Sequence, residues 1–417
     1  MLESLAKRPY FSLLPFFIFY VLIILTQSGD TLIGDEGRYL WFAANLSNGF
    51  YSPPPPQINL WNGPGFPAYL LPFVVAGMPY LVIRLFNAVL CFCTLLIFHK
   101  TLTRFFDAKR SFVITLIYGC YYMPYKSLPF ILSETLTVFL ISGITFYAVS
   151  FFSGKSKPGT PVMLSLLLAA LALTKVIFGQ VFLFAGIAFF LLYLFTRNIL
   201  YRKSSLMMLY ALLFCLPYLV YTHALTGRIF YWSNAGGMSL YWMSNPVKGE
   251  WGEWHNDDLT SPVMDTKSYA LLQANHREEY AGIHTLQGVA RDDKFKEVAL
   301  HNITGHPGKF ILNWLANWSR MLFNYPVSYV PFTLGTAANM LANIPILLLL
   351  LYSTILTIRP GKKIPFSIRF LLILSVIYLL GTSLLSAYDR MFYILAPVFG
   401  LWISYALSDP EKVKSVT

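Results

Sequence analysis

The chain is dominated by apolar runs that are long enough to cross a membrane. Such runs recur from Tyr10 to Leu407, and a helix of about 20 apolar residues covers a hydrocarbon core of about 30 Å. Backbone groups without hydrogen bonds are costly in lipid, so spanning runs of this kind form helices. Only 12% of the residues are charged, against about 25% in a typical soluble domain. The sequence therefore predicts an all-α polytopic membrane protein.

Basic loops set the expected topology. Loops rich in lysine and arginine face the cytoplasm under the positive-inside rule, so we expect both termini there and an even number of crossings between successive basic clusters. The stretch 66–78 is short and contains Pro67, Pro72 and Gly77, which predicts a re-entrant or interfacial element. About ten spans remain, at roughly 10–26, 80–99, 111–126, 129–151, 160–174, 177–196, 205–224, 336–358, 366–386 and 391–407.

Two polar segments interrupt the apolar runs on the expected extracytoplasmic side. The first loop, 27–78, belongs to a predicted N-terminal transmembrane module at 1–224. The second segment, 225–335, is large enough for a small subdomain, and its amphipathic, tryptophan-bearing part at 310–323 predicts an interfacial helix. Residues 336–417 are then a C-terminal transmembrane module. We expect the protein in a bacterial inner membrane or its equivalent.

Ionisable residues gather near the outer ends of the predicted spans. Charged groups at membrane depth are costly and usually face a cavity or a charged partner. They come from five separate regions of the chain, and their convergence is the main functional signal: Asp35, Glu36, Arg38, Glu134, Lys175, Asp389 and Arg390. The structural alternatives are an ion pair of Glu134 with Lys126, an interfacial anchor at Lys175, an ion pair of Arg390 with Asp389, and a helix cap by Asp35 or Glu36 before Tyr39.

Several motifs resemble those of a known enzyme family. The segment Gly34-Asp35-Glu36-Gly37-Arg38-Tyr39, directly after the first span, resembles the first-loop motif of the GT-C membrane glycosyltransferases. It is most similar to the lipid A aminoarabinose transferase and protein O-mannosyltransferase type. Further segments resemble other elements of that family, namely 62–67, 84–87, 133–136, 234–251, 306–310 and 388–392 followed by Pro397. The chain departs from the family at Phe392, where tyrosine is common, and at Asp389, where glutamate is common.

The resemblance implies a GT-C-type helical bundle with extracytoplasmic juxtamembrane helices. It also implies transfer of a sugar from a polyprenyl-phosphate carrier to a lipid, glycan or protein acceptor on the extracytoplasmic face, with inversion at the anomeric carbon. A general base and fixed cations for the departing phosphate suit that chemistry. The candidates are Asp35 as base with Glu36 second; Arg38, Lys175 and Arg390 for the phosphate; Glu134 as a supporting or metal-binding group; and Tyr39, Trp254 and His255 for the sugar or acceptor.

The partners expected on this reasoning are a polyprenyl-phosphate-linked sugar, its acceptor and membrane lipids. The net charge of +12 is spread over short loops rather than one patch, so we expect no nucleic acid. Asp35, Glu36, Glu134 and the outer histidines offer ligands for Mg²⁺, Mn²⁺ or Zn²⁺, although no spacing requires a metal.

Two other functions remain open at this point. A lipid-linked glycan flippase or transporter would carry charges near the middle of the membrane, whereas these charges favour one surface. An O-antigen-type polymerase or ligase would share the fold, and the sequence separates it poorly from a transferase that uses a monophosphate carrier.

Overall fold

The structure is a computed structural model that describes residues 2–154, 156–255, 266–358 and 363–408. Over these residues it is helical with no strand, which confirms the all-α prediction. Six helices are long and apolar enough to cross a membrane, so the chain is a multi-pass membrane protein. They are α2–α3 (Pro9–Gln27), α6 (Tyr80–Leu102), α8 (Ser133–Phe152), α10 (Ile177–Thr196), α17 (Leu334–Ile358) and α18 (Phe366–Ser383).

The prediction of about ten spans is not confirmed among the described residues. A seventh span exists if α11 (Ile199–Phe214) and α12 (Leu216–Thr226), which meet at 54°, count as one. Other predicted spans are shorter helices: α7 (Ala108–Gly119), α9 (Thr160–Thr174) and α20 (Ala396–Ala406). Proline residues account for the shortness of two of these helices, α7 and α20. The chain passes into a 3-10 turn, η1 (Met123–Ser127), that contains Pro124, and Pro397 lies in the first turn of α20.

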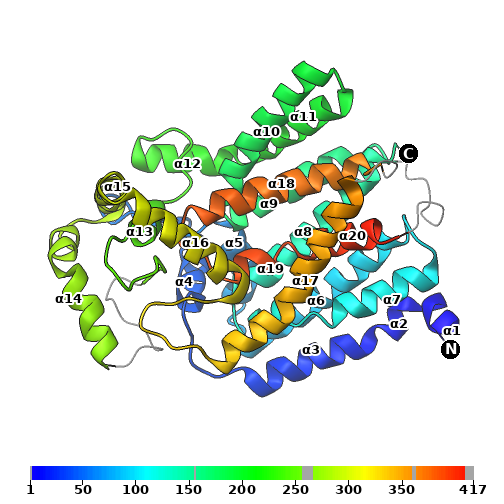
Figure 1. The fold of residues 1–417 in the computed structure, drawn as a ribbon, viewed down its shortest axis with the longest axis horizontal. Helices are drawn as coiled ribbons and strands as arrows, with labels where there is room; N and C mark the ends of the chain where they lie inside the picture. The colour runs from blue at the N-terminus through cyan, green and yellow to red at the C-terminus, as the bar shows by residue number, and fades with distance from the viewer. Residues whose placement is uncertain (1, 155, 256–265, 359–362, 409–417) are drawn as a thin grey trace.

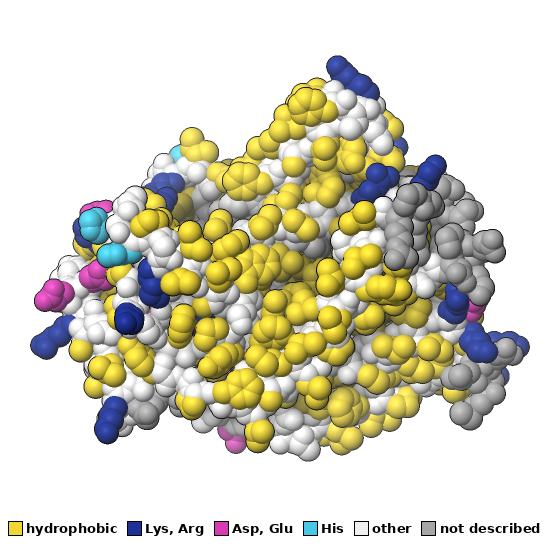
Figure 2. All heavy atoms as spheres, viewed as in Figure 1, with side chains coloured by type: hydrophobic (Ala, Val, Ile, Leu, Met, Phe, Trp, Pro, Cys, Tyr) yellow, Lys and Arg dark blue, Asp and Glu magenta, His cyan; other side chains and the backbone are white. Residues whose placement is uncertain are grey.

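The apolar helices form a bundle with a polar assembly at one end. In Figure 1 α13 (Gly236–Met243), α14 (Thr266–Ile283) and α15 (Gly288–Gly305) lie at one end, whereas both termini lie at the other. Figure 2 shows apolar side chains across the middle of this face and charged side chains toward its ends. Exposed apolar surface of this extent is typical of contact with lipid. Which end faces the cytoplasm stays a prediction from the basic loops.

The first loop contributes two short helices, α4 (Glu36–Ser47) and α5 (Gly65–Val75). α5 has 11 residues with Pro72 inside it, so its length suits the predicted non-spanning element. Gly63 and Gly65, just before and at its start, pack directly on the end of α9. A β-carbon on Gly63 would lie 2.0 Å from the backbone oxygen of Leu173, and one on Gly65 would lie 2.6 Å from Thr174 Oγ1. Only glycine permits this approach, which brings the first loop to the α9–α10 turn.

The predicted amphipathic helix is α16 (Pro307–Phe323), and its two faces are reversed relative to a soluble helix. Its apolar residues Ile311, Leu312 and Leu315 are exposed, whereas its polar residues Asn317 and Arg320 are buried. Asn317 Nδ2 donates to the backbone oxygens of residues 383 and 385, and Arg320 donates to that of residue 387. The apolar face therefore suits a membrane interface, while the polar face fixes the segment that follows α18.

The outer helices α13, α14 and α15 enclose a small core of their own around Trp242 and Phe295. Asp292 of α15 lies at its edge, where its Oδ1 accepts a hydrogen bond from the backbone N–H of Gly237 at 2.7 Å. Burial raises the pKa of Asp292 from 3.8 to about 6, because its charged form loses water. The subdomain is therefore more stable with this carboxyl protonated.

A first prediction concerns the topology. Cysteines introduced at the exposed positions Asp30 and Gln273 should react with a membrane-impermeant maleimide added outside the cell, because both lie at the predicted outer end. A cysteine at the exposed position Arg202 should react only after permeabilisation. Labelling is read by gel shift, with the wild-type chain and its four native cysteines as the baseline. External labelling at Arg202 with protection at Asp30 would reverse the orientation.

A second prediction concerns Asp292. A carboxyl with a raised folded-state pKa contributes stability that is complete below its unfolded value and is lost as the pH rises through the folded value. The wild type should therefore lose about 3 kcal/mol between about pH 4 and pH 6, relative to Asp292→Asn, which keeps the oxygen that accepts from Gly237. Thermal unfolding midpoints of both proteins across this window measure the difference. Parallel curves would contradict a buried, titrating Asp292.

Candidate functional site

One cavity of about 310 Å³ joins most of the predicted site residues. It lies where the first loop, the α9–α10 turn, the start of α13 and the segment between α18 and α20 meet. Six of the residues predicted from the sequence line it, together with the aromatic side chains of Trp61, Trp232 and Tyr388; the six are Asp35, Arg38, Tyr39, Lys175, Trp254 and Arg390. The expected convergence of charges on one cavity is what the structure shows for the four charged residues of this group.

Asp35 and Arg38 lie one helical turn apart at the start of α4. Asp35 is the N-cap residue, yet its side chain makes no capping hydrogen bond. Its Oδ1 instead accepts from Arg38 Nη2 at 2.5 Å. Arg38 Nε donates to Asn62 Oδ1 at 2.7 Å, and its guanidinium lies 4.9 Å from the centre of the Trp61 ring. The carboxylate of Asp35 therefore lines the cavity and does not cap the first turn of α4.

Lys175 ends α9 in an extended conformation, which turns its side chain out of the helix. Its Nζ lies 2.6 Å from Glu134 Oε1, near the start of α8. Arg390 Nη1 approaches the same oxygen at 3.6 Å and Asp35 Oδ2 at 3.4 Å. Glu134 is buried and lies behind the cavity lining. Its carboxylate holds two of the three cations in place.

The structure decides between the ion pairs that the sequence left open. Lys126 pairs with Asp389 and not with Glu134. Asp389 is also 3.4 Å from Asn339 Nδ2, so it belongs to a contact with α17. Arg390, its neighbour in sequence, points to the carboxylates of Asp35 and Glu134 instead.

Glu36 does not share the environment of Asp35. It is fully buried, its Oε1 lies 2.9 Å from Arg84 Nη2, and its two oxygens accept from the backbone N–H groups of Ile33 and Ile131 at 2.7 Å. It does not line the cavity. These contacts occupy its carboxylate, so Asp35 is the carboxylate of this pair that lines the cavity.

Of the three residues proposed for sugar or acceptor contacts, two line the cavity and one does not. Tyr39 lines the cavity, and its hydroxyl lies 3.1 Å from Ser133 Oγ and 3.2 Å from Asn62 Nδ2. Trp254 also lines it. His255 is instead buried against the Trp242 ring, with Nε2 3.4 Å from Glu253 Oε1.

The pKa of Glu253 indicates the role of His255 in that position. Burial by itself would raise the pKa of Glu253, but the hydrogen bond and charge of His255, together with the Arg320 guanidinium, lower it to about 2. His255 therefore contributes to a buried ionic network of the outer subdomain. Nothing in its contacts directs it toward the cavity.

The chain resembles a solved structure in three dimensions but matches no family by sequence. No protein-family model and no curated protein sequence matches the chain. Among solved structures, the crystal structure of ArnT from Cupriavidus metallidurans bound to undecaprenyl phosphate matches with a TM-score of 0.41 and 14% sequence identity, over 95% of this chain and 77% of that chain. Functional conclusions depend on the residues of this chain.

The donor set suits an anion better than a metal ion. Within the described residues, no group of three or more histidine, cysteine, aspartate or glutamate side chains converges. The two carboxylates at the site, Asp35 and Glu134, each contact cations of the protein. A divalent metal at this site stays a prediction from the sequence.

The lining residues that sequence reasoning missed are mostly aromatic and amide side chains. Asn62 joins Arg38 to Tyr39, and Trp61 supports the Arg38 guanidinium. Trp232 packs against Gly179, where a β-carbon would lie 2.2 Å from the indole. Gly63 and Pro64, next to Asn62, are a sequence signal of a tight loop, but the direction of its side chains depends on contacts with α9.

A third prediction concerns the pair of Glu36 and Arg84. Their side chains are 0% and 3% exposed, so Arg84→Met leaves a buried carboxylate without its cation. Such a change costs about 3–5 kcal/mol, and we expect the thermal midpoint in detergent to fall sharply. The double variant Glu36→Gln/Arg84→Met should recover part of that loss. Equal midpoints for wild type and Arg84→Met would show that this pair does not support the first loop.

Proposed function

We propose that this protein is an extracytoplasmic glycosyltransferase that moves a sugar from a polyprenyl-phosphate carrier to a lipid, glycan or protein acceptor. The observation that carries the proposal is the charge constellation at one cavity beside the apolar bundle. Three cations, Arg38, Lys175 and Arg390, meet two carboxylates, Asp35 and Glu134. Three cations against two carboxylates leave one formal positive charge, which suits the anionic phosphate of such a donor.

The cations are arranged to hold the leaving group. Arginine binds phosphate oxygens through two parallel N–H groups, and lysine supplies a compact point charge. Glu134 fixes Lys175 and Arg390 from behind, so neither side chain has to be ordered when a phosphate binds. Preorganised charge of this kind stabilises the negative charge that develops as the phosphate departs.

Asp35 is the general base in this proposal. An acceptor hydroxyl attacks the anomeric carbon, and its proton passes to the Asp35 carboxylate. The bond between the anomeric carbon and the phosphate oxygen breaks, and its electron pair stays on the phosphate near the cations. Attack from the side opposite to the leaving group inverts the anomeric centre. Contacts with Arg38 and Arg390 orient the Asp35 carboxylate for this proton transfer.

An apolar cavity supports the lipid part of the donor. It has a volume of about 370 Å³, and its lining comes mainly from α7, α17 and α20. Phe392 lines it, two residues after Arg390. Tyr122 also lines it, and its hydroxyl donates to Asn339 at 3.0 Å. A polyprenyl chain in this cavity would have its phosphate end near Arg390.

A fourth prediction tests the base. Asp35→Asn keeps the shape of the side chain but cannot accept the proton, so transfer should fall by about 10²–10⁴-fold. Binding of the lipid phosphate should persist, because Arg38, Lys175 and Arg390 remain. Radiolabelled polyprenyl-phosphate sugars are supplied to membranes that contain the overproduced chain, and donor consumption is measured.

Asp30→Asn is the matched control, since Asp30 is an exposed aspartate of the same loop that does not line the cavity. Its rate should equal that of the wild type. Transfer by Asp35→Asn at the wild-type rate would remove Asp35 from the chemistry. Consumption of diphosphate-linked donors alone would indicate a polymerase or ligase, and lipid translocation without sugar transfer would indicate a flippase.

A further inference from the structure

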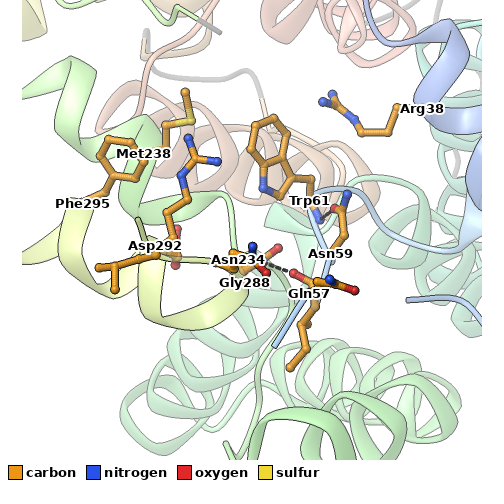
Figure 3. Close-up of a pocket in the computed structure, with 13 residues that line it drawn as sticks. Arg38, Gln57, Asn59, Trp61, Asn234, Met238, Gly288, Asp292 and Phe295 are labelled. Atoms are coloured by element: carbon orange, nitrogen blue, oxygen red, sulfur yellow. Dashed lines mark hydrogen bonds between the residues drawn. The ribbon is translucent and has the colours of Figure 1, made fainter. Parts of the chain in front are cut away.

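A second cavity, of about 410 Å³, opens beside the reaction cavity. Figure 3 shows residues from the first loop on one side of it, including Gln57, Asn59 and Trp61, and Asp292 and Phe295 of α15 on the other. We propose that this cavity binds the saccharide headgroup of the acceptor, while the reaction cavity takes the donor phosphate. Its role in transfer depends on the function proposed above, whereas saccharide binding does not.

The two cavities share a wall. Arg38 and Trp61 line both of them. The Arg38 guanidinium stacks on the Trp61 ring and contacts Asp35 Oδ1 at 2.5 Å. A saccharide in the second cavity would therefore meet, at its inner end, the arginine that orients the proposed base. This geometry gives an acceptor hydroxyl a direct route to Asp35.

The lining chemistry matches a sugar. A pyranose or furanose ring presents apolar C–H groups on its faces and hydroxyl groups around its rim. Trp61 offers apolar aromatic surface, while Phe295 and Met238 are almost fully buried behind it in the core of α13–α15. Arg38, Arg291 and Asp292 add charged groups to the lining, which can also bind sugar hydroxyl groups. Gln57 and Asn59 offer side-chain amides, which both donate and accept hydrogen bonds, as hydroxyl groups do.

The amides at the rim are available to a ligand. In the described part of the chain, the Gln57 side chain and Asn59 Nδ2 make no hydrogen bond to protein, and Gln57 is exposed. Asn59 Oδ1 accepts from the backbone N–H of Trp61 at 3.3 Å, which orients the rest of the amide. A lipid tail would leave such groups unpaired, so the cavity favours a polar headgroup.

Close backbone contacts hold the cavity in shape. A β-carbon on Gly237 would lie 2.0 Å from the backbone oxygen of Asp292, and one on Gly288 would lie 2.6 Å from that of Pro56. Asn234 joins the first loop from the other side, because it accepts from Leu60 N–H at 2.8 Å and donates to Ile58 O at 2.9 Å. A wall fixed in this way loses little entropy when a ligand binds.

Saccharide binding is tested on the full chain in lipid nanodiscs free of glycoside detergent. Saturation-transfer NMR follows a panel of glucose, galactose, glucosamine, glucuronic acid and arabinose, with a serine- and threonine-containing peptide as the other acceptor class. We expect transfer of saturation to at least one sugar. Gln57→Trp, which fills the cavity from its rim, should weaken that binding at least tenfold. Gln273→Trp, at an exposed glutamine outside the cavity, is the matched control and should bind as the wild type does.

A parallel measurement separates this inference from the proposed function. Undecaprenyl phosphate should raise the thermal midpoint of the wild type and of Gln57→Trp equally, and that of Arg390→Gln much less. Sugar binding that is lost in Gln57→Trp alone supports the second cavity. Failure of every sugar to bind, binding of the peptide alone, or equal sugar binding by Gln57→Trp overturns it, even if the lipid phosphate binds. Sugar binding without stabilisation by the lipid phosphate would overturn the proposed donor instead.

Discussion

The buried carboxylate of Glu134 organises the site. Its side chain is only 2% exposed near one end of a spanning helix, where an isolated charge would be costly. It is compensated by Lys175 from the α9–α10 turn and by Arg390 from the segment after α18. Segments about 40 and 250 residues away in the sequence are thereby tied to one point. Arg390 in turn reaches Asp35, and Arg38 completes the group. The cavity is thus built around one charge that the protein cannot leave unpaired.

The two cavities differ in the chemistry of the side chains that line them. The first cavity has three cations beside Asp35 and is the proposed phosphate site, whereas the second combines amides, Trp61 and charged groups of both signs, namely Arg38, Arg291 and Asp292, and is the proposed saccharide site. Arg38 lies between them and contacts both Asp35 and Trp61. Ligands in the two cavities would therefore contact the same guanidinium.

Sequence reasoning predicted the membrane character, the helical class and the convergence of Asp35, Arg38, Lys175 and Arg390, because composition and topology limit where charges can lie. It could not predict which of Asp35 and Glu36 lines the cavity and which is buried. The two are adjacent, and only the distant Arg84 shows which one is buried. It also overcounted the long helices, since hydropathy does not register where Pro124 and Pro397 interrupt an apolar run. The second cavity escaped it because its amides and rings are common residues that become significant only when packed together.

The reversed faces of α16 connect the lipid surface to the chemistry. Its exposed leucine and isoleucine side chains suit the membrane interface. On its opposite face, Asn317 and Arg320 donate hydrogen bonds to the backbone just before Arg390. The depth of an interfacial helix in the membrane depends on the thickness and headgroups of the bilayer. A change in depth would be passed through a few hydrogen bonds to the guanidinium that we propose binds the phosphate. On the proposed function, the rate of sugar transfer would therefore differ between detergent and bilayers of different thickness.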